Sequence, residues 1–71
     1  MNYIPYFETK INELHDEVIA YDSMNFFAEE QLYDPTPLDE AIDKLITEAV
    51  EVYGFIVKYL PNSGRYQVLR G

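Results

Sequence analysis

Apolar side chains recur at helical spacing near the start of the chain. The members of this first set follow one another at intervals of four, three, four and three residues: Phe7, Ile11, Leu14, Val18 and Tyr21. Such intervals line up one stripe of an α-helix and leave the acidic residues of the segment outside it. The pattern predicts a helix over about Tyr6–Tyr21, with Pro5 close to its first turn, where a missing N–H is tolerated.

A second, shorter helix is predicted directly afterwards. Asp22 and Ser23 are residue types that favour the N-cap position, and the aromatic and aliphatic residues that follow favour a helix over about Met24–Leu32. Two prolines follow, Pro35 and Pro37, and each disfavours helical backbone angles at the residue before it. The sequence therefore predicts a bend between this helix and the next.

The clearest start signal for a helix lies just after that bend. Thr36 is a capping residue type, Pro37 suits the first helical position, and Asp39 complements the positive end of the helix dipole. Apolar residues then repeat at helical spacing: Leu38, Ala41, Ile42, Leu45, Ile46 and Ala49. These signals predict a helix over about Pro37–Val52, ended by Gly54.

Two runs rich in β-branched and aromatic residues follow, Phe55–Leu60 and Arg65–Leu69. The turn-forming residues between them, Pro61–Gly64, predict a β-hairpin. One face of that hairpin is expected to be apolar and to consist of Phe55, Val57, Tyr59, Tyr66 and Val68. Because an isolated hairpin is marginal in water, we expect this face to pack on the helices, with Asn2–Ile4 as a candidate third strand.

The expected fold is α+β, with two or three short helices packed on a small antiparallel β-sheet that contains the C-terminal hairpin. The 71 residues suit a single small acidic domain, 1–71, and such a core rarely gives more than ~3–5 kcal/mol of net stability. Cysteine is absent, which fits a reducing cytoplasm. The start of the chain lacks the features of a signal peptide, and no apolar run approaches the ~18–20 residues of a membrane span. We therefore expect a cytoplasmic protein that does not engage a membrane.

Catalytic and cofactor chemistry have little support in the sequence. His15 is the single histidine and lies beside Asp16 and Glu17 on the polar side of the first predicted helix, where we expect it to be solvated. A metal site formed by Glu13, His15, Asp16 and Glu17 is conceivable, but the side chains of consecutive helical residues point in different directions around the axis and cannot all coordinate one ion. The three glycines are isolated and form no phosphate-binding loop. We expect no enzyme activity, no catalytic residue, no metal and no cofactor.

Charge is divided unevenly along the chain. All 13 acidic residues lie between Glu8 and Glu51, whereas three of the five basic residues, Lys58, Arg65 and Arg70, lie beyond them. The formal net charge is −8 at pH 7. An asymmetry of this kind bears on partners rather than on fold. It favours a protein-binding module that presents a dense carboxylate surface.

Carboxylates on the predicted helices are spaced so that they face one another. Positions three or four apart on a helix are neighbours, and like charges there cost a few tenths of a kcal/mol per pair. The candidate partner-binding residues are Glu13, Asp16 and Glu17 on the first helix and Asp39, Glu40, Asp43, Glu48 and Glu51 on the last. One interpretation is a solvated face that only keeps the protein in solution. The other is imitation of a nucleic-acid backbone, which competes for the Lys and Arg arrays of a larger nucleic-acid-binding protein.

The basic C-terminal segment has two interpretations as well. Lys58, Arg65 and Arg70 alternate with Tyr59 and Tyr66, a composition typical of surfaces that bind single-stranded nucleic acid. Three positive charges beside a large negative excess would hold such a ligand weakly, so we expect no direct nucleic-acid binding. Lys58 and Arg65 are expected instead to form a cross-strand or solvent-facing pair that guards the edge of the sheet.

In size, charge and lack of catalytic groups, the chain resembles the small acidic inhibitors that phages and mobile elements use against host defence or transcription enzymes. That resemblance implies an inhibitor that occupies the nucleic-acid-binding surface of a larger protein, such as a CRISPR effector or a restriction enzyme, in the cytoplasm of a bacterial host. The alternative is an adaptor or antitoxin-like module that binds through apolar faces. A homodimer is also expected, because so short a chain cannot bury seven tyrosines and four phenylalanines in one core.

Overall fold

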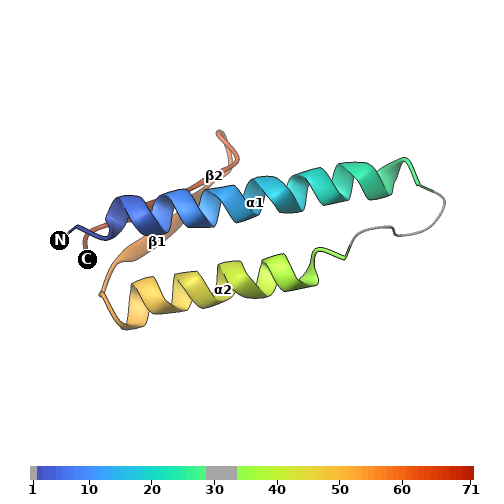
Figure 1. The fold of residues 1–71 in the computed structure, drawn as a ribbon. Helices are drawn as coiled ribbons and strands as arrows, with labels where there is room; N and C mark the ends of the chain where they lie inside the picture. Colours follow the sequence, from blue (N-terminus) through green and yellow to red (C-terminus); the bar gives the residue numbers. More distant parts are fainter. Residues whose placement is uncertain (1, 29–33) are drawn as a thin grey trace.

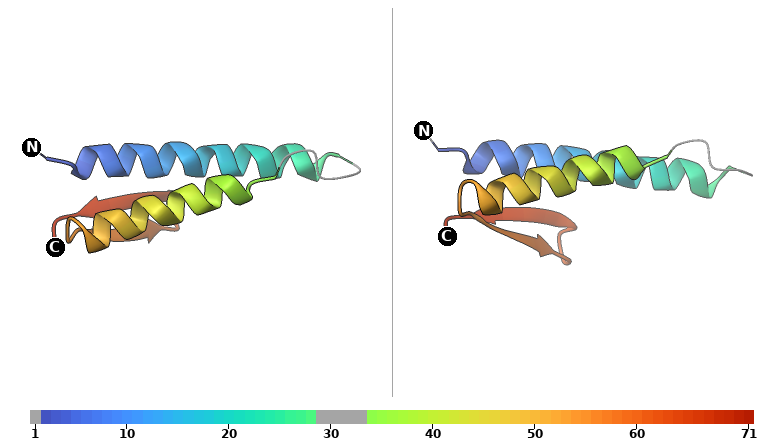
Figure 2. Two further views of the ribbon diagram at one scale, coloured as in Figure 1. Left: turned by 60° about the horizontal axis from the view of Figure 1, so that its bottom comes forward. Right: turned by 90° about the horizontal axis from the view of Figure 1, so that it is seen from below.

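The computed structural model describes residues 2–28 and 34–71, which form two helices followed by a β-hairpin. The elements are α1 (Ile4–Phe26), α2 (Thr36–Glu51), β1 (Ile56–Leu60) and β2 (Arg65–Leu69). The two helices run antiparallel side by side, and the hairpin lies against one side of them, near the end that holds both termini (Figure 1 and Figure 2). The expected α+β architecture with a C-terminal antiparallel hairpin is confirmed.

Helix α1 is longer than the sequence pattern predicts. Asp22 and Ser23 do not start a second helix, because α1 continues through both of them to Phe26. A capping preference marks a boundary only where the chain also breaks, and no Gly or Pro follows Pro5 within this helix. The prediction of a separate helix over Met24–Leu32 is therefore wrong for residues 24–28, and its remainder falls in 29–33, outside the described residues.

The first residues begin α1 and do not form a third strand. Asn2 Oδ1 accepts a hydrogen bond from the N–H of Ile4 at 3.1 Å, which satisfies one of the free amides at the helix start. Pro5 lies in the first turn, where its fixed φ suits a helix. Because this cap and this proline both favour a helix start, the expectation of a strand at Asn2–Ile4 is wrong. Within the described ranges the sheet has two strands.

Helix α2 begins one residue before the predicted Pro37 and ends one residue before the predicted Val52. The carboxylate that supports its start belongs to Asp34, whose Oδ1 accepts a hydrogen bond from the N–H of Thr36 at 3.0 Å. Hydrogen bonds with the Thr36 side chain and backbone lower the pKa of Asp34 from its ordinary value. Thr36 is therefore the first helical residue and a donor to the capping carboxylate, not the cap that its residue type predicts.

Strands β1 and β2 pair antiparallel, with Val57 opposite Val68 and Tyr59 opposite Tyr66. The exit from α2 and the turn of the hairpin both use glycine in the left-handed region, Gly54 at φ 69° and Gly64 at φ 67°. A side chain at either position would be strained, which is why glycine suits them. The predicted helix stop and the predicted hairpin turn are thus confirmed.

The core lies where the hairpin meets the two helices. Its buried apolar residues come from α1, α2 and β2: Phe7, Ile11, Ile42, Ala49 and Val68. Phe55, Val57 and Tyr66 pack against this cluster, and Val68 belongs to it, which confirms four of the five residues predicted for the inward face of the hairpin. The fifth, Tyr59, is 47% exposed. The molecule measures 45 × 24 × 16 Å, and the hairpin covers only the part of the helix pair near the termini (Figure 2). Neither of the two described helices is long and apolar enough to cross a membrane.

Candidate functional site

The eight candidate partner-binding carboxylates are all exposed on α1 and α2. We call this two-helix surface the acidic layer, and it consists of Glu13, Asp16, Glu17, Asp39, Glu40, Asp43, Glu48 and Glu51. Each of these residues lies outside the apolar stripe of its helix, as its spacing predicts. Because α2 runs back along α1 (Figure 1), the fold places both groups in one layer of the molecule. Neither strand of the hairpin carries an acidic residue.

One carboxylate of the acidic layer has a basic partner on the hairpin. Asp16 Oδ2 lies 3.6 Å from Arg65 Nη1, and both side chains are about half exposed. An exposed pair of this kind contributes ~0–1 kcal/mol to folding stability. Lys58 and Arg65 both face solvent, as expected, but they are not partners across the sheet. Lys58 lies opposite Gln67, and Arg65 lies opposite Leu60.

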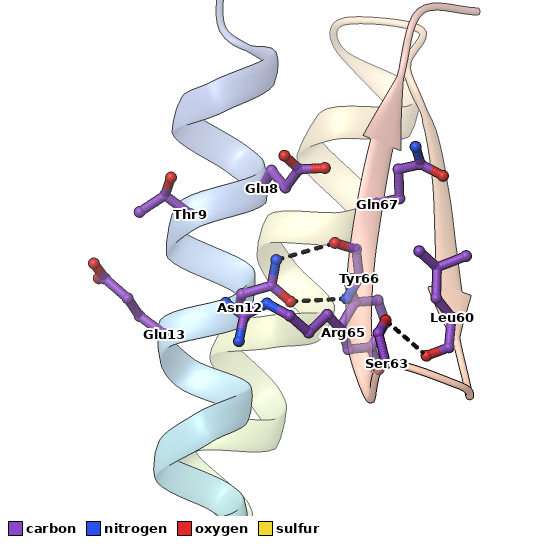
Figure 3. Close-up of a pocket in the computed structure, with 9 residues that line it drawn as sticks. All are labelled: Glu8, Thr9, Asn12, Glu13, Leu60, Ser63, Arg65, Tyr66 and Gln67. Atoms are coloured by element: carbon purple, nitrogen blue, oxygen red, sulfur yellow. Dashed lines mark hydrogen bonds between the residues drawn. The ribbon is translucent and has the colours of Figure 1, made fainter.

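Two polar residues of α1 hold the outer edge of β2, a role that the sequence pattern did not indicate. Asn12 Nδ2 donates a hydrogen bond to the Tyr66 carbonyl at 3.0 Å, and the Tyr66 N–H donates to Asn12 Oδ1 at 2.7 Å (Figure 3). The N–H of Val68 donates to Glu8 Oε1 at 3.1 Å. Asn12 is only 5% exposed. Backbone groups that a further strand would pair are satisfied here by helix side chains.

The spacing of these contacts follows from the geometry of the two elements. Glu8 and Asn12 are about one helical turn apart, a rise of ~6 Å, and Tyr66 and Val68 are two strand residues apart, a rise of ~6.8 Å. The two intervals are close enough for both side chains to reach the same strand. Asparagine is a poor helix former, so Asn12 in the middle of a long helix is a signal that could have indicated a tertiary hydrogen bond.

A shallow groove of about 520 Å³ lies between α1 and β2 (Figure 3). Its walls are formed by Glu8, Thr9, Asn12, Glu13, Leu60, Ser63, Arg65, Tyr66 and Gln67. Glu8 and Asn12 are already engaged by the backbone of β2, so two of its polar groups serve the fold. In the part of the chain that the structure describes, no three His, Cys, Asp or Glu side chains gather as a metal site.

His15 is not the solvated side chain that the sequence predicts. Its ring lies edge-on against Tyr59 and Tyr66, with centroid separations of 5.7 and 5.4 Å. Its Nε2 is buried and has no hydrogen-bond partner among the described residues. The expectation failed because His15 follows Asn12 by three positions, which places it on the side of α1 that faces the hairpin.

Replacing His15 with phenylalanine is expected to stabilise the fold by about 1 kcal/mol. Phenylalanine keeps a ring against both Tyr59 and Tyr66 and removes a buried nitrogen whose hydrogen bond is missing. Urea unfolding followed by circular dichroism measures the change. A loss of stability larger than about 1 kcal/mol would contradict this assignment, because it would mean that Nε2 makes a hydrogen bond in the folded protein.

The distal end of α1 carries the other conspicuous exposed surface, and it is apolar. Phe26 and Phe27 are 81% and 86% exposed, and Ile19 is 48% exposed. These three residues, with Asp22 and Ser23, surround a hollow of about 310 Å³. Ile19 and Phe26 follow Asn12 at seven-residue intervals, so they continue the hairpin-facing side of α1 beyond the end of the hairpin.

The acidic layer and this apolar end of α1 are two exposed surfaces that differ in chemistry, one charged and one apolar. Compared with known proteins, the chain matches no family model, no curated protein and no solved structure.

Proposed function

We propose that the chain is a small acidic inhibitor that binds the nucleic-acid-binding surface of a larger protein through its acidic layer. The observation that carries this proposal is the exposure of all eight carboxylates on one pair of packed helices. Five of them lie on α2 between Asp39 and Glu51, a rise of ~18 Å, which is about one carboxylate per 4 Å of helix axis. One strand of a nucleic-acid duplex presents a phosphate every ~3.4 Å of axis. Arrays of Lys and Arg that bind the phosphates of a duplex can therefore also bind the carboxylates of α2.

The acidic layer is poorly compensated within the chain, which supports the same proposal. Lys10 and Lys44 are the basic residues of the two helices, against eight candidate carboxylates. Like charges three or four residues apart repel by a few tenths of a kcal/mol per pair. A basic partner would relieve this repulsion on binding, and the field of the free protein would steer the encounter.

The class of protein that we propose is the one that phages and mobile elements use against CRISPR effectors or restriction enzymes, acting in the cytoplasm of a bacterial host. The proposed target is a larger protein with a basic groove. We propose no catalytic role, no cofactor and no direct binding of nucleic acid, since the negative excess repels a phosphate backbone. The rings of Tyr59 and Tyr66 would be needed to stack bases, yet they pack on each other and on His15.

The second candidate function is an adaptor or antitoxin-like module, and the apolar end of α1 favours it. Phe26 and Phe27 are far more exposed than the other large apolar side chains of the described chain, apart from Val52. Contiguous apolar surface on a soluble domain often marks a binding site. In this alternative the partner docks on Phe26, Phe27 and Ile19, and the carboxylates only keep the protein in solution.

Salt dependence separates the two candidates. With the chain immobilised and a bacterial lysate as the source of partners, a charge-led complex is expected to dissociate as the Debye length falls from ~10 Å at 0.1 M to ~3 Å at 1 M ionic strength. A complex made through Phe26 and Phe27 would persist over this range and would be lost in the double variant Phe26→Ser, Phe27→Ser. Retention at 1 M salt combined with that loss would replace the inhibitor proposal by the adaptor.

A further inference from the structure

The hydrogen bonds of β2 determine which backbone groups of β1 are free. The N–H and the carbonyl of Tyr66 both pair with Asn12, and the N–H of Val68 donates to Glu8. The backbone polar groups of these two residues therefore point away from β1. In an antiparallel ladder, the residue opposite such a residue also turns its backbone groups away from its neighbour. Val57 and Tyr59 are the residues opposite Val68 and Tyr66. Their N–H and carbonyl groups therefore point out from the free edge of β1.

The two edges of the sheet consequently differ in whether their backbone groups have hydrogen-bond partners. Side chains of α1 cover the edge of β2, whereas no hydrogen bond within the described ranges reaches the outward groups of β1. Four of the five β1 residues are exposed. Ile56 and Tyr59 are 44% and 47% exposed, and Val50 and Val52, at the end of the helix that packs on β1, are 45% and 71% exposed. A free edge on a strand that also exposes apolar side chains, here Ile56 and Tyr59, favours the addition of another strand.

We propose that this edge pairs with the same edge of a second copy of the chain, which gives a continuous four-stranded antiparallel sheet. The surface area supports a partner of this size. The molecule exposes 5233 Å², whereas a compact monomer of 8.3 kDa is expected to expose about 4,600 Å². The excess of roughly 600 Å² is close to the ~800 Å² that each partner buries in a standard interface.

The charge distribution supports a second copy at this place. Each copy has a net charge of −8, so two copies repel one another over most of their surface. The hairpin is the segment without acidic residues, and Lys58 is the single charged residue of β1. The edge of β1 is therefore where two copies approach at the smallest electrostatic cost.

The register follows from the outward groups and from Lys58. The outward backbone groups of two copies can pair about a two-fold axis in three registers. The axis passes through Val57, Lys58 or Tyr59. A centre at Lys58 sets two ammonium groups directly opposite each other, which is unfavourable. A centre at Tyr59 sets Pro61, which has no N–H, opposite Val57. The centre at Val57 keeps the two ammonium groups apart and places Ile56 opposite Lys58 of the second copy. It sets Phe55 opposite Tyr59; the Phe55 N–H already donates to Ala49, but the Phe55 carbonyl can still accept from Tyr59. This is the register that we propose.

Two measurements on the unmodified chain test the pairing. Sedimentation at micromolar to submillimolar concentration is expected to give a species of twice 8.3 kDa. Amide hydrogen exchange followed by NMR is expected to slow at Val57 and Tyr59 as concentration rises, whereas Lys58, which pairs with β2, stays protected throughout. Because both copies are acidic, added salt should strengthen this dimer, which is opposite to the effect on the proposed target complex. Failure of one proposal can therefore be told from failure of the other.

Charge substitution at Ile56 tests the register. Ile56→Lys places a second ammonium group opposite each Lys58 and is expected to weaken dimerisation about tenfold or more, because symmetry repeats the pair. Ile56→Glu places a carboxylate there and should leave the dimer intact or tighten it. Ile19→Lys, at a position on α1 of similar exposure (48% against 44%), is the matched control and should have no such effect.

A monomer at every concentration would overturn the proposal. So would fast exchange of the Val57 and Tyr59 amides in a dimer, or a dimer that tolerates Ile56→Lys. Assembly beyond the dimer would also contradict it, because the two-fold pairing uses up the free edge of each copy. Should Ile56→Lys fail to fold, the exchange of the Val57 and Tyr59 amides in the unmodified chain decides the question.

Discussion

Substituting Asn12 with aspartate is expected to destabilise the fold by about 2 kcal/mol or more at neutral pH. Aspartate has nearly the same shape and can still accept the Tyr66 N–H, but its second oxygen would face the Tyr66 carbonyl in place of a donor. A buried, unsatisfied polar group costs ~1–3 kcal/mol, and a buried charge costs more. Against ~3–5 kcal/mol for the whole domain, this loss brings the protein close to unfolding.

The same substitution has a predicted pH dependence. Burial and the facing carbonyl both raise the folded-state pKa of the introduced carboxyl above its unfolded value of ~3.9. The stability regained by protonation is therefore fully present below the unfolded pKa and is lost as pH rises through the folded pKa. Urea unfolding of variant and wild type should give a stability difference that shrinks toward acid pH, where the protonated group can donate to Tyr66.

Glu8→Gln is the matched control for that experiment. Glutamine keeps an oxygen that can accept the Val68 N–H, so the expected change is below about 1 kcal/mol. An Asn12→Asp variant as stable as wild type at neutral pH would show that the two hydrogen bonds to Tyr66 do not hold β2 on α1. The arrangement of the hairpin relative to the helices would then need revision.

Neutralising the carboxylates of α1 is expected to have the largest effect on partner binding. The carboxylates of α2 begin in its first turn, where the helix dipole offsets part of their mutual repulsion. Glu13, Asp16 and Glu17 lie in the middle of α1, where the helix dipole does not offset their repulsion. The triple change Glu13→Gln, Asp16→Asn, Glu17→Gln should weaken target binding by roughly 1 kcal/mol or more per engaged charge. Titration calorimetry at low and high salt measures the loss, which should shrink as salt is raised.

Two control variants separate an effect of the triple change on target binding from an effect on folding. Asp16→Asn alone removes the pair with Arg65 and is expected to change folding stability by ~0–1 kcal/mol, so it reports how much of any effect belongs to the fold. Lys10→Gln changes charge on the same helix in the opposite sense and should leave binding unchanged or slightly tighter. If the triple variant binds with wild-type affinity in low salt, α1 does not contact the target through these carboxylates.

The parts of the fold that could be predicted from sequence are those set by local chemistry. The turn at Pro61–Gly64 and the stop at Gly54 depend on residues within a few positions of each other, so both were visible in the chain. The break predicted at Asp22 and Ser23 failed because capping preference is weak unless Gly or Pro also interrupts the helix. Capping preferences alone therefore predict helix boundaries poorly.

Contacts between distant segments could not be predicted. Asn12 and Tyr66 are 54 positions apart, and nothing in either neighbourhood shows that the side chain of one meets the backbone of the other. The prediction of a solvated His15 is wrong for the same reason, since it was based on the acids near His15 in the sequence, whereas the rings of Tyr59 and Tyr66, which are distant in the sequence, contact it. The exposure of the acidic layer was predictable, because it follows from helical periodicity, but periodicity does not indicate what binds there.

Competition with DNA tests the central claim most directly. A protein captured by the chain at low salt is loaded with a fluorescent DNA duplex, and the anisotropy of the duplex is followed as the chain is added. If the acidic layer occupies the nucleic-acid-binding surface, the duplex is released as the chain binds, and the α1 triple variant releases it at a correspondingly higher concentration. A stable ternary complex, in which the chain binds while the duplex stays bound, would contradict the claim.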